Sequence, residues 1–298
     1  MVSYRAKIVR WILKSRATKQ EYSTENIAKY RNGFERNSKI LFPKDNSINT
    51  KHEQIEGVNV VWFTADKNPE RTIVYLHGGG FILGSSDSYH QHLARLAKLC
   101  DAKVLSIDYS LAPENPFPSA LDDILRVWRT LLKNKLDVST TVIAGDSAGG
   151  NLVMASALRI RTENLPQPAC LAMLSPALDA TFSGESYKSN KDTELVLTTE
   201  SLNYYVQSYV QNNSKENALI SPVFAKLNGL PPFIIQVGSG EVLLSDAEQT
   251  IKNAKRDGVE AKLIIEPEMW HGWQLFAKLI PEARKSMQEI ADYIVSKT

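Results

Sequence analysis

The chain has 298 residues, of which 43% are hydrophobic and 23% are charged, a composition typical of one large folded domain, with or without an added cap. The formal net charge of +2 gives no electrostatic support for a nucleic-acid partner, and none is expected. No apolar run reaches the roughly 20 residues that span a bilayer, so no stable membrane insertion is expected. Cys100 and Cys170 lie in apolar contexts and are predicted to be buried free thiols, which agrees with a cytoplasmic location.

The N-terminal residues mix basic and apolar side chains. Apolar residues recur at helical spacing at Tyr4, Ile8, Trp11 and Ile12, so they predict one face of a helix. We expect this face to pack on the protein's own body. A helix lying on a membrane surface is the alternative, because the intervening residues are basic.

From about residue 53 onward, strands and helices alternate. Short apolar strands separated by helices predict a mostly parallel central sheet with helices on both faces. The expected strands are 58–63, 72–77, 103–109, 141–144, 170–174, 232–237 and 261–265, and the expected helices are 89–100, 120–132, 152–161 and 281–294.

Two segments do not fit this alternation. Residues 1–45 precede it, and residues 181–217 form a polar stretch between two of the expected strands. We therefore assign 1–45 to the N-terminal part of a cap and 46–298 to the main α/β domain, with a cap insertion at about 181–217.

A candidate nucleophile lies at the end of the strand 141–144. The stretch Gly145-Asp146-Ser147-Ala148-Gly149 has the spacing of a sharp strand-to-helix turn that lifts a serine hydroxyl clear of a sheet. A glycine-rich turn without chemistry is the alternative, because such turns end many strands.

A serine hydroxyl needs a base that takes its proton and an acid that orients the base. Reacting groups in an α/β sheet collect at the carboxyl ends of the strands, and His271 follows the last expected strand. His52 is predicted to be a solvated loop residue. His90 and His92 lie near a helix start and are predicted to be surface or packing residues.

Two carboxylates follow the strand 232–237. Glu241 is closer to the strand end and is the predicted acid, while Asp246 remains a rival. Asp246 is more readily explained as a cap of the helix that begins near Ser245. The order serine, acid, histidine is that of an α/β-hydrolase.

An anion site is expected where the stretch His77-Gly78-Gly79-Gly80-Phe81 closes an early strand. Glycines let backbone N–H groups approach a developing negative charge, and the N–H of Ala148 is the expected second donor. A plain turn is one alternative. A phosphate cradle is disfavoured, because no Gly-Lys-Ser/Thr follows.

Together these stretches resemble the hormone-sensitive lipase family of α/β-hydrolases, in particular its bacterial carboxylesterases. The resemblance also rests on 108–114, 116–120, 145–152 and His271-Gly272. It implies an α/β-hydrolase fold with a helical cap, Ser147 as nucleophile, His271 as base, and Gly78, Gly79 and Ala148 as oxyanion donors. One departure is Glu241, since the family's acid is usually an aspartate; this keeps Asp246 open.

The expected function is hydrolysis of short to medium acyl esters through an acyl-enzyme, with a small-molecule ester as substrate. Amidase or peptidase chemistry by the same residues and a non-catalytic small-molecule receptor are the alternatives. A homodimer paired through the edge of the last strand is compatible with the resemblance. No metal or cofactor is expected. The candidate pocket residues, each equally explained by packing, are Phe81, Tyr109, Phe182, Tyr187, Tyr204, Tyr205, Trp270 and Trp273.

Overall fold

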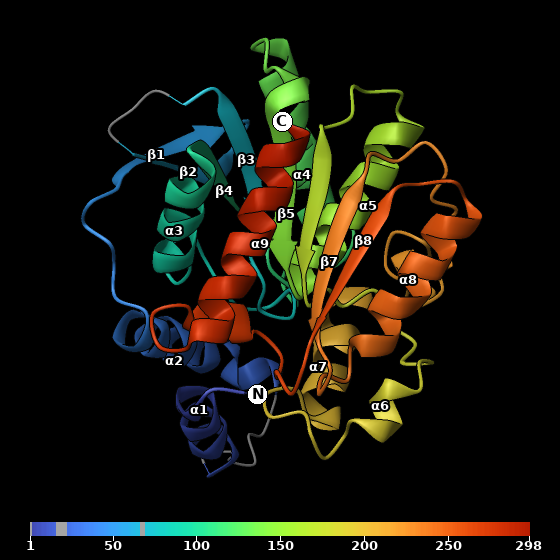
Figure 1. Cartoon of the computed structure of the whole chain (residues 1–298). Helices are drawn as coiled ribbons and strands as arrows, with labels where there is room; N and C mark the ends of the chain where they lie inside the picture. The colour runs from blue at the N-terminus through green and yellow to red at the C-terminus, as the bar shows by residue number, and fades with distance from the viewer. Residues whose placement is uncertain (1, 16–22, 66–68) are drawn as a thin grey trace.

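The computed structural model describes residues 2–15, 23–65 and 69–298; residues 1 and 16–22 of the predicted cap segment lie outside these ranges. Within them, eight strands form one sheet (Figure 1): β1 (Asn49–Ile55), β2 (Val58–Thr64), β3 (Arg71–Leu76), β4 (Ala102–Asp108), β5 (Thr141–Asp146), β6 (Cys170–Leu174), β7 (Phe233–Gly238) and β8 (Ala261–Glu266). The strand order is β1-β2-β4-β3-β5-β6-β7-β8. β2 pairs antiparallel with β1 and β4, and all other neighbours are parallel.

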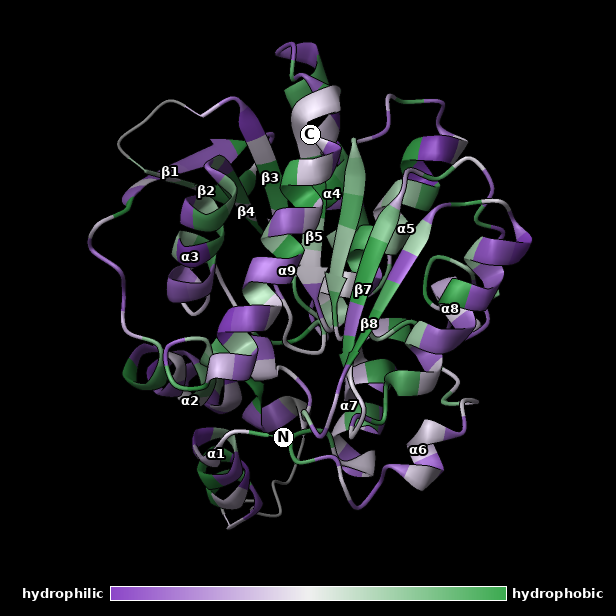
Figure 2. Ribbon diagram, viewed as in Figure 1, coloured by the Kyte–Doolittle hydropathy of each residue, from purple (hydrophilic) through white to green (hydrophobic). Residues whose placement is uncertain are grey.

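Side chains of the central strands alternate between two apolar layers. In β3, Ile73 belongs to the core cluster on one face and Val74 to the cluster on the other, as the two-residue period of a strand requires. The first face is covered by α3 (His90–Cys100) and α9 (Pro281–Lys297), the second by α4 (Ser119–Lys133), α5 (Ala148–Thr162) and α8 (Leu244–Arg256). β7 is hydrophobic along most of its length (Figure 2). The predicted mostly parallel sheet with helices on both faces is confirmed.

The predicted N-terminal helix exists as α1 (Tyr4–Ser15), but it packs on the body through a different face from the expected one. Ala6 is buried, and Val9 and Leu13 contact the core cluster that includes α9. Tyr4 and Trp11 are 79% and 70% exposed. No described helix is long and apolar enough to cross a membrane.

Two elements near the N-terminus were not predicted. α2 (Ile27–Leu41) lies within the segment assigned to the cap, and β1 pairs with β2 at the edge of the sheet. His52 lies in β1, so its prediction as a loop residue is wrong, although the side chain is exposed. The side chains of β1 are mostly polar because this edge strand contributes little to the core.

The insertion at 181–217 contains α6 (Ser186–Ser189) and α7 (Thr199–Val210). Figure 1 shows α1, α2, α6 and α7 at the end of the sheet toward which the parallel strands point. Short 3₁₀ helices complete the described secondary structure: η1 (Thr24–Asn26), η2 (Val138–Thr140), η3 (Pro222–Phe224) and η4 (Trp273–Phe276). Residues of the N-terminal segment and of the segment 181–217 therefore lie together at the carboxyl ends of the strands.

Candidate active site

Ser147 lies in the turn that joins β5 to α5. Its backbone has φ +54° and ψ −122°, a strained conformation for any residue with a side chain. The turn lies very close to the last residue of β3, Leu76. A Cβ added to Gly145 would lie 2.6 Å from the Leu76 carbonyl oxygen, and a Cβ added to Gly149 would lie 2.0 Å from it. Only glycine fits at either position. Because the turn leads directly into the helix, α5 begins at Ala148 and not at residue 152 as predicted.

Three side chains from neighbouring strand ends meet in one chain of hydrogen bonds. Ser147 Oγ lies 2.9 Å from His271 Nε2, and His271 Nδ1 lies 2.9 Å from Glu241 Oε2. Ser147 follows β5, Glu241 follows β7 and His271 follows β8. The structure therefore brings together the nucleophile, acid and base that the sequence predicted. A carboxylate only accepts hydrogen bonds, so the Nδ1 hydrogen faces Glu241 and the lone pair of Nε2 faces the serine hydroxyl.

The loops after β7 and β8 are packed tightly enough to fix this arrangement. A Cβ at Gly238 would lie 2.3 Å from the carbonyl oxygen of Met269, and the Gly240 N–H donates to that oxygen at 3.2 Å. Glu241 Oε1 accepts from the Gly238 N–H at 2.6 Å and from Ser175 Oγ at 2.7 Å. Sequence reasoning did not identify Ser175. Its place directly after β6 is the property that could have found it.

The environment of His271 favours its protonated form. Burial alone would lower the pKa of the imidazole, but the hydrogen bond that His271 Nδ1–H donates to Glu241 and the charge of that carboxylate outweigh it, so the pKa is raised above its ordinary value of 6.5. The nearby carboxylate of Glu194 acts in the same direction. An imidazole of this kind gains stability when it takes a proton from the serine.

Asp246, the rival acid, is held elsewhere. Its Oδ2 accepts from the N–H groups of Leu178 and Asp179 at 2.9 and 3.0 Å and from the Tyr187 hydroxyl at 3.0 Å. Burial, then the charge of Asp179, raises the pKa of this carboxyl well above its ordinary value. Its predicted role as a cap of α8 is wrong, because it lies within the first turn and holds the loop at 178–179. Its bonds do not include His271.

The glycine-rich loop after β3 corrects one predicted donor. The Gly78 N–H donates to Asp146 Oδ1 at 3.0 Å, so it is not free to bind an oxyanion. In the described part of the chain, no acceptor is bonded to the N–H of Gly79, Gly80 or Ala148. Gly79 and Gly80 have φ of +121° and +61°, conformations that suit glycine.

Asp146 has a positioning role that sequence reasoning missed. Besides the Gly78 N–H, this buried carboxyl accepts from the hydroxyls of Tyr75 and Tyr89 at 2.9 and 2.8 Å. Burial raises its pKa, although the tyrosine hydrogen bonds oppose this. Asp146 directly precedes Ser147, so its hydrogen bond to the Gly78 N–H links the glycine-rich loop to the turn that holds Ser147.

The two histidines of α3 are packing residues, as predicted. His92 Nε2 lies 3.0 Å from the Tyr75 hydroxyl, and burial lowers the pKa of this imidazole to about 3. His90 is buried and its Nδ1 accepts from the Asp45 N–H at 3.3 Å. Among the residues that the structure describes, no group of three or more His, Cys, Asp or Glu side chains could hold a metal ion.

Residues 73–275 match the model of a family described by the alpha/beta hydrolase fold. An esterase from Acinetobacter venetianus is 32% identical over 257 residues, which cover 86% of this chain and 85% of that protein. An acetyl-hydrolase from Streptomyces hygroscopicus is 34% identical over 238 residues, covering 80% and 79%. The crystal structure of a hormone-sensitive lipase from a metagenome library is 36% identical, with coverage of 100% of this chain and 99% of that one and a TM-score of 0.94.

The chain belongs to the hormone-sensitive lipase family of α/β-hydrolases. As a member of this family it is a carboxylic ester hydrolase. The matched range contains all three side chains of the hydrogen-bonded chain and the glycine-rich loop. The resemblance inferred from the sequence motifs is thus confirmed.

A cavity of about 40 Å³ lies beside Ser147 in this hormone-sensitive lipase family member. It is lined by Ser147 and Ala148 below, by several residues of α7 above, and by four of the predicted pocket residues: Phe81, Phe182, Tyr187 and Tyr205.

The other four predicted pocket residues do not line this cavity. Tyr109 stacks on His77 and donates to its carbonyl oxygen at 2.6 Å. Tyr204 packs against the core cluster on the α4–α5 face. Trp270 and Trp273 are buried in the cluster on the opposite face, with α3 and α9. The sequence showed that these residues are aromatic, but it did not show which face of the sheet each one would pack against.

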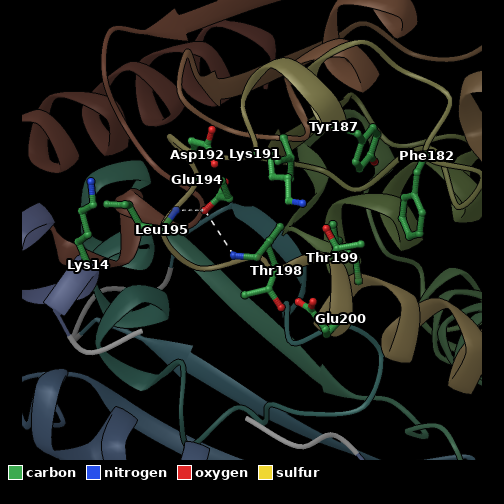
Figure 3. Close-up of a pocket in the computed structure, with 13 residues that line it drawn as sticks. Lys14, Phe182, Tyr187, Lys191, Asp192, Glu194, Leu195, Thr198, Thr199 and Glu200 are labelled. Carbon is green, nitrogen blue, oxygen red and sulfur yellow. Dashed lines mark hydrogen bonds between the residues drawn. The ribbon is translucent and has the colours of Figure 1, made fainter. Parts of the chain in front are cut away.

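A second, larger cavity of about 370 Å³ adjoins the first (Figure 3). Both are lined by Phe182 and Tyr187. Most of its wall comes from the insertion at 181–217, and Lys14 of α1 completes it. Glu194 Oε1 accepts from the N–H of Leu195 at 2.8 Å in this wall (Figure 3). The N-terminal helix and the segment 181–217 therefore share one cavity, which adjoins the cavity at Ser147.

Proposed function

We propose that this member of the hormone-sensitive lipase family hydrolyses short-chain carboxylic esters through an acyl-enzyme formed on Ser147. The observation that carries the proposal is the unbroken chain of hydrogen bonds from Ser147 through His271 to Glu241. A receptor without catalysis would not need a base and an acid aligned on a serine at a strained turn. The combination favours nucleophilic catalysis.

The reaction proceeds in two half-reactions. Ser147 Oγ attacks the ester carbonyl carbon while its proton moves to His271 Nε2. The bond to the leaving oxygen breaks as His271 returns that proton to the alcohol. A water molecule then gives a proton to His271 Nε2 and attacks the acyl carbon. The bond from the acyl carbon to Ser147 Oγ breaks as His271 returns this proton to Oγ, which releases the carboxylic acid and restores the serine. Glu241 accepts the hydrogen bond from the Nδ1–H group throughout and stabilises the imidazolium.

The oxyanion of each tetrahedral intermediate is bound by backbone N–H groups. We assign this role to Gly79, Gly80 and Ala148, because these amides donate to no acceptor among the described residues and because Gly80 and Ala148 line the cavity beside Ser147. Gly78 is replaced in this role, since its N–H is bonded to Asp146. Removing one such donor typically lowers kcat by about 10²- to 10³-fold.

The helices α2, α6 and α7, together with α1, are proposed to form the cap. α7 contributes most directly: a Cβ at Gly80 would lie 2.5 Å from the ring of Tyr205. Tyr209, also on α7, stacks on Phe81 with ring centroids 3.8 Å apart. The cap thereby limits the space above the nucleophile.

The acid limb of the pH profile is expected to lie above pH 6.5. His271 must be neutral to accept the serine proton, and its pKa in the free enzyme is raised by Glu241. kcat/KM for a soluble ester should therefore fall as pH decreases through a midpoint above 6.5. In the variant Glu241→Gln the residual activity should show this midpoint at a lower pH. A limb in the wild type that lies well below 6.5 would contradict the assignment of His271 as base.

Short acyl chains are expected to react fastest. The cavity beside Ser147 is small, at about 40 Å³, and the relative from Streptomyces hygroscopicus is named an acetyl-hydrolase. We expect kcat/KM for p-nitrophenyl acetate or butyrate to exceed that for the dodecanoate at least about tenfold, because an extra poorly accommodated methylene costs about 1–3 kcal/mol. A rate that rises with chain length beyond the onset of emulsion formation would contradict it. The matched p-nitroanilide, run in parallel, measures any amidase activity.

A further inference from the structure

We propose that α1 is a docking helix for an anionic phospholipid surface. The observation behind this is an apolar patch that the fold leaves uncovered on α1. We define the docking face as Tyr4, Ile8 and Trp11, which are 79%, 43% and 70% exposed. With about 100° of rotation per residue, these three side chains fall within about 60° of one another on the helix.

The opposite face of α1 already has its partner within the protein. Ala6 is buried and Val9 and Leu13 pack against the core cluster of α3 and α9. Ser3, just before the helix, donates to the carboxylate of Glu282 on α9 at 2.9 Å through its hydroxyl. The helix is thus anchored to the body by one side. The docking face is therefore exposed on a helix that is held firmly in place.

The charges beside the docking face indicate which partner it fits. α1 carries four basic residues and no acidic residue. Arg10 pairs with Glu268, whereas Arg5, Lys7 and Lys14 are exposed and form no ion pair with any described residue. On the helix, Lys7 and Lys14 flank the docking face on one side and Arg5 on the other. Exposed aromatic and aliphatic residues bordered by cations are typical of helices that lie in the headgroup region of anionic membranes.

A second copy of the chain fits this face less well. A stable protein interface buries about 800 Å² on each partner, and a large aromatic side chain contributes about 150–250 Å² when it is fully covered. Three partly exposed side chains fall short of that area. Like-charged flanks would also repel each other across a symmetric contact.

Docking would hold the larger cavity close to the lipid. Lys14, at the C-terminal end of α1, lines this cavity of about 370 Å³, which adjoins the cavity at Ser147. Small esters that partition into the membrane surface would then be concentrated near the site. Binding to lipid itself does not depend on the proposed reaction.

Flotation with phospholipid vesicles tests the proposal. We expect the full chain to float with vesicles of phosphatidylcholine and phosphatidylglycerol, and at least about tenfold less protein to float with phosphatidylcholine alone. Two double variants should reduce flotation by a similar factor: Ile8→Ser with Trp11→Ser, which removes apolar area, and Arg5→Glu with Lys7→Glu, which reverses charge. Trp11 fluorescence should shift to shorter wavelength on binding, because the other four tryptophans are partly or fully buried.

The matched control is Val295→Ser, which removes an apolar side chain that is 40% exposed near the C-terminal end of α9, far from α1 in Figure 1. It should float like the wild type. Hydrolysis of soluble p-nitrophenyl acetate, unchanged in all variants, shows that the fold is retained. Wild-type protein that stays unbound to anionic vesicles would overturn the proposal, as would equal flotation of the docking-face variants. A concentration-dependent dimer in light scattering that Trp11→Ser abolishes would assign the face to self-association instead.

Discussion

Replacing Ser147 by alanine is expected to lower kcat/KM for p-nitrophenyl acetate by about 10⁴- to 10⁶-fold. Without the hydroxyl no acyl-enzyme forms, and the remaining rate comes from the oxyanion donors and substrate binding. The fold should survive the change, because the Ser147 side chain makes no capping hydrogen bond to α5. Steady-state kinetics, with a thermal melt of each protein, measure both effects.

Ser156→Ala is the matched control for this prediction. Ser156 lies on α5, the helix that follows Ser147; it is buried, and its hydroxyl has no hydrogen-bond partner in the described part of the chain. Its loss should leave kcat/KM within about twofold of wild type, since surplus buried hydroxyls cost little to remove. Near-full activity of Ser147→Ala would show that another residue is the nucleophile.

The second large expected effect distinguishes Glu241 from Asp246 as the acid that orients His271. Glu241→Gln is expected to lower kcat by about 10³- to 10⁴-fold, because a side-chain amide no longer fixes the imidazole tautomer or stabilises its charge. Asp246→Asn is expected to leave kcat within about threefold of wild type. The carboxamide oxygen of asparagine can still accept from the N–H groups of Leu178 and Asp179, and burial already favours the neutral form of this carboxyl.

The two substitutions are isosteric and each replaces a carboxyl group by a carboxamide, so each is the control for the other. kcat should be measured at saturating ester and at a pH above the acid limb. Thermal melts of both variants separate a catalytic loss from unfolding. Loss of turnover in Asp246→Asn alone would identify Asp246 as the acid and contradict the proposed role of Glu241.

The sheet and the meeting of three hydrogen-bonded side chains were predictable because they depend on local patterns and on one general rule. Apolar runs predicted the strands, and Ser147, Glu241 and His271 were found by looking at the ends of β5, β7 and β8. The rule works because the carboxyl ends of parallel strands share one edge of the sheet. β1 was not predicted, because its side chains are mostly polar and exposed.

Other features depend on contacts that a single segment does not reveal. The Gly78 N–H was predicted to face the oxyanion, but a carboxylate 68 residues away accepts it, Asp146 Oδ1. Trp270 directly precedes His271 in sequence, yet its ring is buried in the core cluster that α3 and α9 cover and does not line the cavity at Ser147. α1 has apolar residues on two faces, and periodicity alone did not show which face the body would cover. In each case the partner is distant in sequence.

The most direct test of the central claim is a crystal structure of the protein inactivated by a short-chain alkyl p-nitrophenyl phosphonate. The phosphorus should be bonded to Ser147 Oγ, with its phosphoryl oxygen within hydrogen-bond distance of the N–H groups of Gly79, Gly80 and Ala148, and with Glu241 still bonded to His271. A phosphonate attached to any other residue, or inactivation that leaves Ser147 unmodified, would contradict the account.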